Sequence, residues 1–251
     1  MTGALSSITA LWIDPVMSAV FGVALIGGFA RGLAGFGVGL IMMPICASVI
    51  GPAVTIPMMA LIDAPTATWL ASKVWRDFDR REVLTLLIAC AGGTPVGIAV
   101  LLLIEPDVIK NIASVIVLFF AVALLFGLKL GGEPSTRRST GTGFVAGVLE
   151  GSVGLPGPPI ILVWLATQVP GARLRANIIM FFFGMMLIVV PAFTIAGLMT
   201  AETILMTAAV FPFFFGGVLL GNLASGHVPE AIFRKIVLGL VSAGAISALL
   251  T

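Results

Sequence analysis

The chain has 251 residues, of which 59% are hydrophobic and only 10% are charged. Its mean hydropathy of +1.20 lies far above that of soluble domains, in which about a quarter of the residues are charged. This composition excludes an ordinary soluble enzyme, and the two cysteines, both in apolar stretches, exclude a disulfide framework or a CxxC metal site.

Apolar segments follow one another along the whole chain. They lie near 16–34, 37–50, 54–72, 83–104, 108–130, 141–152, 158–169, 176–198, 202–221 and 231–251. Residues 83–104 form a run of 22 residues, and a helix of that length rises roughly 33 Å, enough to cross the hydrocarbon core. We therefore predict an all-α polytopic membrane protein with about eight to ten membrane helices.

Two glycine-rich segments interrupt this pattern and match each other. The first runs from Gly28 to Gly39 and the second from Gly147 to Pro158. They align without a gap at a shift of 119 residues, which superimposes Gly28, Gly32 and Gly35 on Gly147, Gly151 and Gly154. A duplicated, broken membrane helix is typical of a transporter core.

Each break offers a place where a helix starts again inside the membrane. The first N–H groups of such a helix lack intrahelical partners and carry partial positive charge. Pro158 and Pro159 suit the first turn of one restarted helix, and the other restarts near Gly39. Two such starts near the midplane would bind an anion. The alternative is that the Gly-xxx-Gly pairs serve only close helix packing.

Basic residues gather in four connections, which predicts that these connections are cytoplasmic. The connections lie at 73–81, 129–138, 173–175 and 226–235 and hold 11 of the 13 Lys and Arg. Each half then contains a hairpin of short or re-entrant helices followed by three full spans. Because three is odd, the second half enters the membrane upside down. We expect a first inverted repeat over 1–130, a cytoplasmic linker over 131–140 and a second repeat over 141–251.

Ionisable residues inside the apolar segments are candidates for function by default. Arg31 lies within the first break, and Glu150 holds the matched position in the second. They could form a structural ion pair that locks the halves. Alternatively, Arg31 contacts the anion and Glu150 exchanges with substrate or a proton, or the two residues simply lie at a membrane edge. Asp63, in the middle of 54–72, is a second proton-coupling candidate or lies beside a water-filled vestibule.

Two amide side chains complete the candidate set. Asn177 and Gln168 could donate hydrogen bonds to an oxyanion, although bonding between helices is the commoner role of such residues. The residues that we expect to bind substrate are Arg31, Gly35, Phe36, Gly37, Gly39, Glu150, Gly154, Leu155, Pro156, Gly157, Pro158 and Asn177.

The stretch from Arg31 to Pro44 and the stretch from Gly147 to Pro159 resemble the two signatures of the sulfite exporter TauE/SafE family. The resemblance covers nearly the whole chain. It implies a transporter of the bacterial inner membrane whose cargo is a sulfur-containing anion such as sulfite, sulfoacetate or thiosulfate. By position it places the substrate beside Gly35, Gly37, Gly39, Gly154, Gly157 and Pro158.

We therefore expect a secondary carrier that exports a small oxyanion or sulfonate by alternating access, with protons moving on Glu150 or Asp63. The alternatives are an uncoupled anion channel and a membrane scaffold or partner subunit without transport of its own. The expected partners are the anion, the lipid bilayer and, in a homo-oligomer, further copies of the chain. We expect no nucleic acid, no metal and no cofactor, and the lack of a Walker A motif argues against an ATP-driven subunit.

Overall fold

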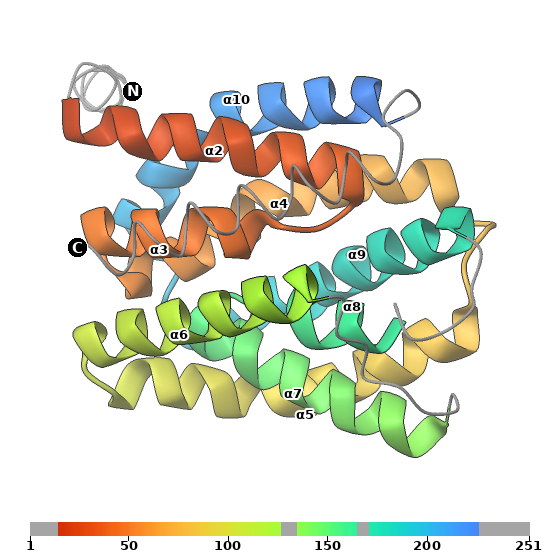
Figure 1. The fold of residues 1–251 in the computed structure, drawn as a ribbon. Helices are drawn as coiled ribbons and strands as arrows, with labels where there is room; N and C mark the ends of the chain where they lie inside the picture. Colours follow the sequence, from red (N-terminus) through yellow and green to blue (C-terminus); the bar gives the residue numbers. More distant parts are fainter. Residues whose placement is uncertain (1–14, 127–134, 165–170, 226–251) are drawn as a thin grey trace.

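The chain folds into long helices that run along a common direction (Figure 1). The structure is a computed structural model that describes residues 15–126, 135–164 and 171–225. These described ranges contain no strand, and their helices are α2 (Pro15–Ala34), α3 (Val38–Ile50), α4 (Pro52–Val74), α5 (Arg80–Leu103), α6 (Pro106–Leu125), α7 (Thr136–Val153), α8 (Gly157–Trp164), α9 (Gly171–Ile195) and α10 (Ala201–Ala224).

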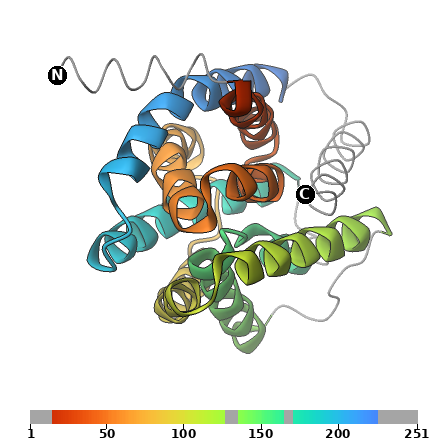
Figure 2. The same ribbon diagram turned by 90° about the vertical axis from the view of Figure 1, so that its left-hand side faces the viewer.

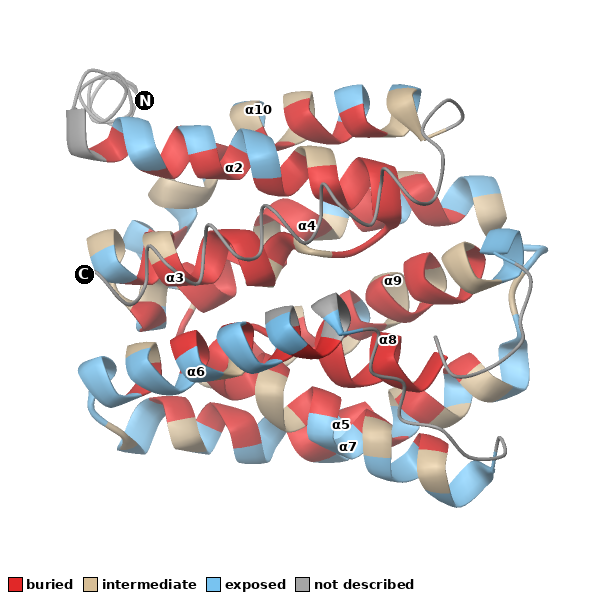
Figure 3. Cartoon of the chain, in the orientation of Figure 1, coloured by how far each residue is buried: buried red, intermediate tan, exposed pale blue. Residues whose placement is uncertain are grey.

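Within the described residues, five helices are long and apolar enough to cross a membrane, namely α2, α4, α5, α9 and α10. Exposed residues lie on the outer faces of the bundle (Figure 3). Many of them are large and apolar, and Ile88, Leu103 and Ile195 are among the most exposed. Water would not favour such faces, whereas lipid does. The prediction of an all-α polytopic membrane protein is confirmed.

The two halves exchange helices. In Figures 1 and 2, α2 from the first half lies along α10 from the second, and α7 from the second half lies along α5 from the first. Between these two pairs lie α3, α4, α8 and α9, and α4 packs on α9. Each half is therefore built partly from the other, so neither forms a separate core.

Glycines allow both of these helix pairs to approach closely. A Cβ on Gly28 or Gly32 of α2 would overlap backbone atoms of α10, at Phe214 and Val218 respectively. On the other side, a Cβ on Gly147 or Gly151 of α7 would overlap backbone atoms of α5. The packing interpretation of the Gly-xxx-Gly pairs is confirmed at these four positions. The glycines that follow them in sequence have left-handed backbone and lie where the helices end.

Helix boundaries recur along the chain at the separation seen in the sequence. The ends of α2 and α7, the starts of α3 and α8, and the starts of α4 and α9 are each 119 residues apart. One boundary departs from the prediction, because α7 begins at Thr136, inside the linker expected over 131–140. The Ser135 side chain accepts a hydrogen bond from the Arg138 N–H and so caps this earlier start.

The connections divide between the two ends of the bundle. The α4–α5 connection and the starts of α7 and α9 lie at the right-hand end in Figure 1, and the α5–α6 and α9–α10 connections lie at the left-hand end. Basic residues of 73–81, 137–138 and 173–175 therefore share one end. Lys129 and the connection 226–235 lie outside the described residues.

Candidate functional site

Both helix breaks are built on glycines with left-handed backbone. Gly35 and Gly37 follow α2 with φ of +83° and +107°, and Gly154 follows α7 with φ of +67°. Only glycine adopts these angles at low cost, so each helix stops here and the chain turns back. The restarts at Val38 and Gly157 agree with the predicted restarts. Pro158 and Pro159 lie in the first turn of α8, where no intrahelical N–H bond is lost.

The two breaks touch each other. A Cβ on Gly39, in the first turn of α3, would overlap the carbonyl oxygen of Gly154 in the opposite break. Residues 151–164 are all buried, which meets the requirement that irregular backbone at membrane depth be enclosed by protein. The starts of α3 and α8 therefore face a shared interior space.

Two adjoining small cavities occupy that space. The first, the restart cavity, has a volume of about 20 Å³ and is lined by Phe36, Gly37, Val38, Gly39, Leu40, Gly154, Leu155, Pro156, Gly157, Pro158 and Phe182. The second, the carboxyl cavity, has a volume of about 30 Å³ and is lined by Val38, Gly39, Met59, Ala60, Asp63, Glu150, Gly154, Pro156, Phe182, Met185 and Met186. Each has room for about one or two water molecules, which is less than a sulfonate needs.

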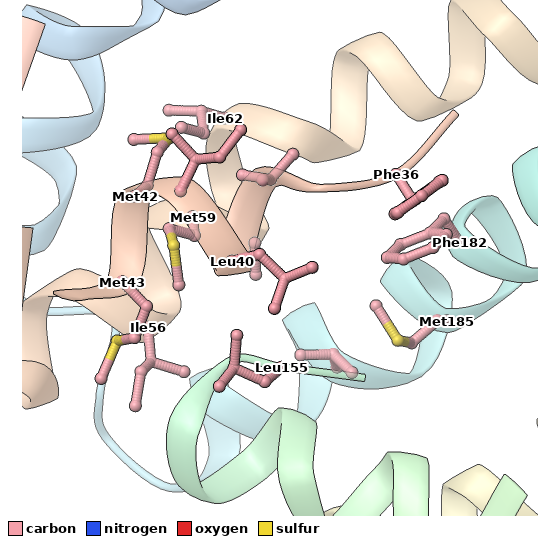
Figure 4. Packing of buried hydrophobic residues seen from close by; sticks show 14 of the residues in the cluster. Phe36, Leu40, Met42, Met43, Ile56, Met59, Ile62, Leu155, Phe182 and Met185 are labelled. Atoms are coloured by element: carbon pink, nitrogen blue, oxygen red, sulfur yellow. The ribbon is translucent and has the colours of Figure 1, made fainter. Parts of the chain in front are cut away.

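Apolar side chains close this space from several helices. Figure 4 shows Phe36 and Phe182 side by side, with Leu40, Leu155 and Met185 directed toward the same region. Phe182 lines both cavities. Its ring therefore lies at the centre of the closed site.

Arg31 is the charged centre of the site. Its side chain is fully buried (0% exposed) and its Nε donates to Asp63 Oδ1 at 2.7 Å. Its Nη1 donates to the carbonyl oxygen of Gly35, which satisfies a backbone group left open at the end of α2. Its Cζ lies 4.8 Å from the centroid of the Phe182 ring. Nη2 has no hydrogen-bond partner among the described residues.

The acid paired with Arg31 is Asp63 on α4, not Glu150. Asp63 Oδ1 also accepts a hydrogen bond from the Thr66 hydroxyl at 2.8 Å, so one carboxylate oxygen serves two donors. The alternative of an ion pair between Arg31 and Glu150 is therefore wrong for this conformation. The reason is that the first-half helix α4 presents its acid directly to α2, across a sequence separation of 32 residues.

Glu150 lies across the carboxyl cavity. It is 5% exposed and lines the same cavity as Asp63, but in the described part of the chain its carboxyl group makes no hydrogen bond and no ion pair. It lies in the last turn of α7, where the helix dipole disfavours negative charge. The carboxyl cavity thus has one compensated and one uncompensated acid.

The remaining predicted residues divide into two groups. Phe36, Gly37, Gly39, Gly154, Leu155, Pro156, Gly157 and Pro158 all line a cavity. Asn177 lines neither, and its side-chain oxygen accepts a hydrogen bond from the Asp79 N–H at 2.7 Å, which ties α9 to the start of α5. Gln168 lies outside the described residues.

Phe182 and Arg175 were not predicted from the sequence. Phe182 lies 119 residues after Asp63. The repeat therefore aligns Phe182 with a candidate site residue, which could have indicated its place in the site. Arg175, interpreted as one of the topology-setting charges, donates from Nη2 to the carbonyl oxygen of Gly32 at 3.0 Å. It therefore brings a second cation to the end of α2, one residue from Arg31.

No group of three metal-ligating side chains occurs within the described ranges. The site instead offers a buried guanidinium with an unused donor, two carboxyl groups and two helix starts. Residues 20–248 match the sulfite exporter TauE/SafE family. The chain belongs to this family. No curated protein and no solved structure matches it. The TauE/SafE membership, together with the apolar helices, establishes a multi-pass membrane transporter rather than an enzyme.

Proposed function

We propose that this TauE/SafE chain is a secondary transporter that exports a small sulfur-containing anion, such as sulfite, sulfoacetate or another organosulfonate. The observation that carries the proposal is the convergence of two restarted helices on one buried space. Asp63 and Phe182, which line the adjoining carboxyl cavity, connect this space to Arg31.

The start of α3 presents free N–H groups and partial positive charge. At the start of α8, the two prolines that follow Gly157 have no N–H, so this helix contributes the N–H of Gly157 and its dipole. A guanidinium matches the paired oxygens of a sulfonate.

The small size of both cavities supports a mechanism of alternating access. Neither has room for a sulfonate, so the anion enters only when helices around the space move apart. We infer that the two halves are an inverted repeat whose relative movement opens each side in turn. The recurring helix boundaries and the exchanged pairs α2–α10 and α7–α5 support this arrangement.

Orientation follows from the distribution of charge. We propose a location in the bacterial inner membrane, with the end that carries the basic connections in the cytoplasm. Arg175 then lies between that end and Arg31, and its charge extends the attraction for an anion toward the cytoplasmic side. This direction suits export.

Proton movement balances the charge of the cargo in our proposal. Asp63 and Glu150 line one small cavity, and two ionised carboxylates so close together and away from water repel each other. Binding and release of a proton by this pair would relieve the repulsion during transport. A channel without coupling would carry the same anions but would not accumulate them against a gradient.

Flux of labelled sulfite and sulfoacetate into proteoliposomes tests the proposed function. We expect the wild-type chain to accumulate at least one of these anions when a pH gradient is imposed. Arg31→Ala lowers this flux by about tenfold or more, because a buried charged contact is lost. Arg31→Lys retains the charge but not the planar fork, so its flux lies between those of the wild type and Arg31→Ala.

Arg76→Ala is the matched control, because Arg76 is exposed and its guanidinium lies over Trp75. Its flux is expected to equal that of the wild type. Thermal unfolding and gel filtration establish that each variant is folded. Wild-type flux in a folded Arg31→Ala protein removes Arg31 from the site. Flux that does not depend on the pH gradient favours the alternative of an uncoupled anion channel.

A further inference from the structure

We propose that Asp63 is a built-in counter-anion, which occupies Arg31 while the site is empty and is replaced there by the transported anion. The proposal rests on the proposed function and deepens it. It defines the cargo as an anion that carries at least two oxygens on one atom, as sulfite, sulfonates and carboxylates do. Asp63 is then a specificity-determining residue of the same site.

The guanidinium of Arg31 is only partly used as a hydrogen-bond donor. Nε and Nη2 form one edge of a guanidinium, and a carboxylate or sulfonate usually takes both donors of such an edge. Here Asp63 Oδ1 takes only Nε, at 2.7 Å, and Nη2 is buried without a partner among the described residues. An unsatisfied buried donor is costly. An incoming oxyanion that takes both donors therefore binds better than Asp63 does.

Asp63 has a cavity and a second hydrogen-bond donor beside it. It lines the carboxyl cavity, and Thr66, one turn further along α4, already donates to its Oδ1. When the carboxylate leaves Arg31, this hydroxyl remains as a donor. The position 119 residues later holds Phe182, which has no charge to offer. The pseudo-symmetric arrangement therefore contains one counter-anion and one anion site.

Few charged groups surround Asp63. They are Arg31 from α2 and Glu150 from α7. The cavity residues from α3 and α9 are apolar or glycine, and α8 carries no charged residue between Gly157 and Trp164. In the described parts of α5, α6 and α10 the charged residues lie only near the helix starts.

A carboxylate displaced from Arg31 therefore faces Glu150 with no cation in the cavity. Two like charges in so small a space are unfavourable unless a proton joins them. The anion thus replaces the negative charge of Asp63 at Arg31, and a proton is taken up by the Asp63–Glu150 pair. At Arg31 one negatively charged group of the cargo replaces one carboxylate, and one proton neutralises the displaced charge. The second charge of a dianion such as sulfoacetate lies outside this exchange. Binding is then tighter at lower pH.

The test is Asp63→Asn in the full chain, because the carboxamide has the shape of the carboxylate but neither its charge nor its proton. Sulfoacetate is the probe, since its own charge does not change across the mildly acidic to mildly basic range. For the wild type we expect the apparent Kd to rise by up to about tenfold per pH unit. For Asp63→Asn we expect a lower Kd that is independent of pH, retained exchange of sulfoacetate and no accumulation driven by a pH gradient.

Asp77→Asn is the control, because Asp77 is an exposed acid in the α4–α5 connection, and it keeps the wild-type behaviour. If wild-type protein neither binds nor carries sulfite or sulfoacetate, both the proposed function and this inference are overturned. If the wild type transports and Asp63→Asn keeps its pH dependence, only the counter-anion is overturned.

Asp63→Glu covers the case in which the carboxamide does not fold. Its longer carboxylate reaches further along the Nε–Nη2 edge of Arg31 and competes better with the cargo. We therefore expect weaker binding of sulfoacetate than in the wild type. Equal or tighter binding contradicts the proposal.

Discussion

At the scale of single residues, the environment of Arg31 explains why so costly a group is kept. Bringing a charged pair out of water costs several kcal/mol per ion, and well-packed apolar residues often replace a buried pair without loss of stability. Arg31 and Asp63 are 0% and 5% exposed as side chains. Stability alone therefore does not require this pair, and intramembrane charges of this kind mark the path of a substrate or proton.

The charged residues were predictable, but their partners were not. Arg31, Asp63 and Glu150 stand out because each interrupts an apolar segment. The pairing of Arg31 with Asp63 depends on how α2 and α4 are rotated about their axes, which the positions in sequence do not determine. The repeat aligns Arg31 with Glu150, which makes their positions in the two halves equivalent. Residues at equivalent positions need not contact each other. Phe182 was missed because a phenylalanine in an apolar helix carries no signal of its own.

At the scale of helices, the glycines perform two different tasks. Those within α2 and α7 let α10 and α5 approach, and those after them let the chain reverse. The sequence contained the positions of the breaks and of the restarts, because left-handed glycines and first-turn prolines have local causes. The start of α7 was placed too late, since its polar first turns resemble a linker.

A matched pair of substitutions in α7 tests the packing task. A Cβ on Gly147 would overlap the carbonyl oxygen of Cys90 in α5, so Gly147→Ala forces the two helices apart and destabilises the protein by roughly 1–3 kcal/mol. Gly141 is exposed and has no atom near the added Cβ, so Gly141→Ala is neutral or stabilising by up to about 1 kcal/mol. Thermal unfolding in detergent measures both, and equal stabilities would contradict this account of the α5–α7 contact.

At the scale of the whole molecule, the exchanged helix pairs make the two halves depend on each other. The α2–α10 and α7–α5 pairs flank the shared interior formed by α3, α4, α8 and α9. Among the described residues, the basic residues of 73–81, 137–138 and 173–175 share one end of the bundle, as the charge distribution predicted. The sequence could not show that the halves exchange helices, since that depends on packing between distant segments.

Single cysteines test the orientation of the bundle. The native Cys46 and Cys90 are buried, so background labelling is low. Asp77→Cys lies in the connection that we place in the cytoplasm, and Glu105→Cys lies at the opposite end. In intact cells we expect a membrane-impermeant maleimide to label Glu105→Cys but not Asp77→Cys. Asp77→Cys is labelled only after the cells are permeabilised. The reverse labelling pattern would show that the protein has the opposite orientation in the membrane.

The central claim is that an anion binds where the two helix breaks meet beside Arg31. Anomalous diffraction from crystals soaked in 2-bromoethanesulfonate, recorded at the bromine edge, locates such an anion directly. We predict a bromine peak between the starts of α3 and α8, with the sulfonate within hydrogen-bond reach of Arg31. Peaks confined to the exposed basic connections, from a preparation that transports sulfonates, would contradict the account.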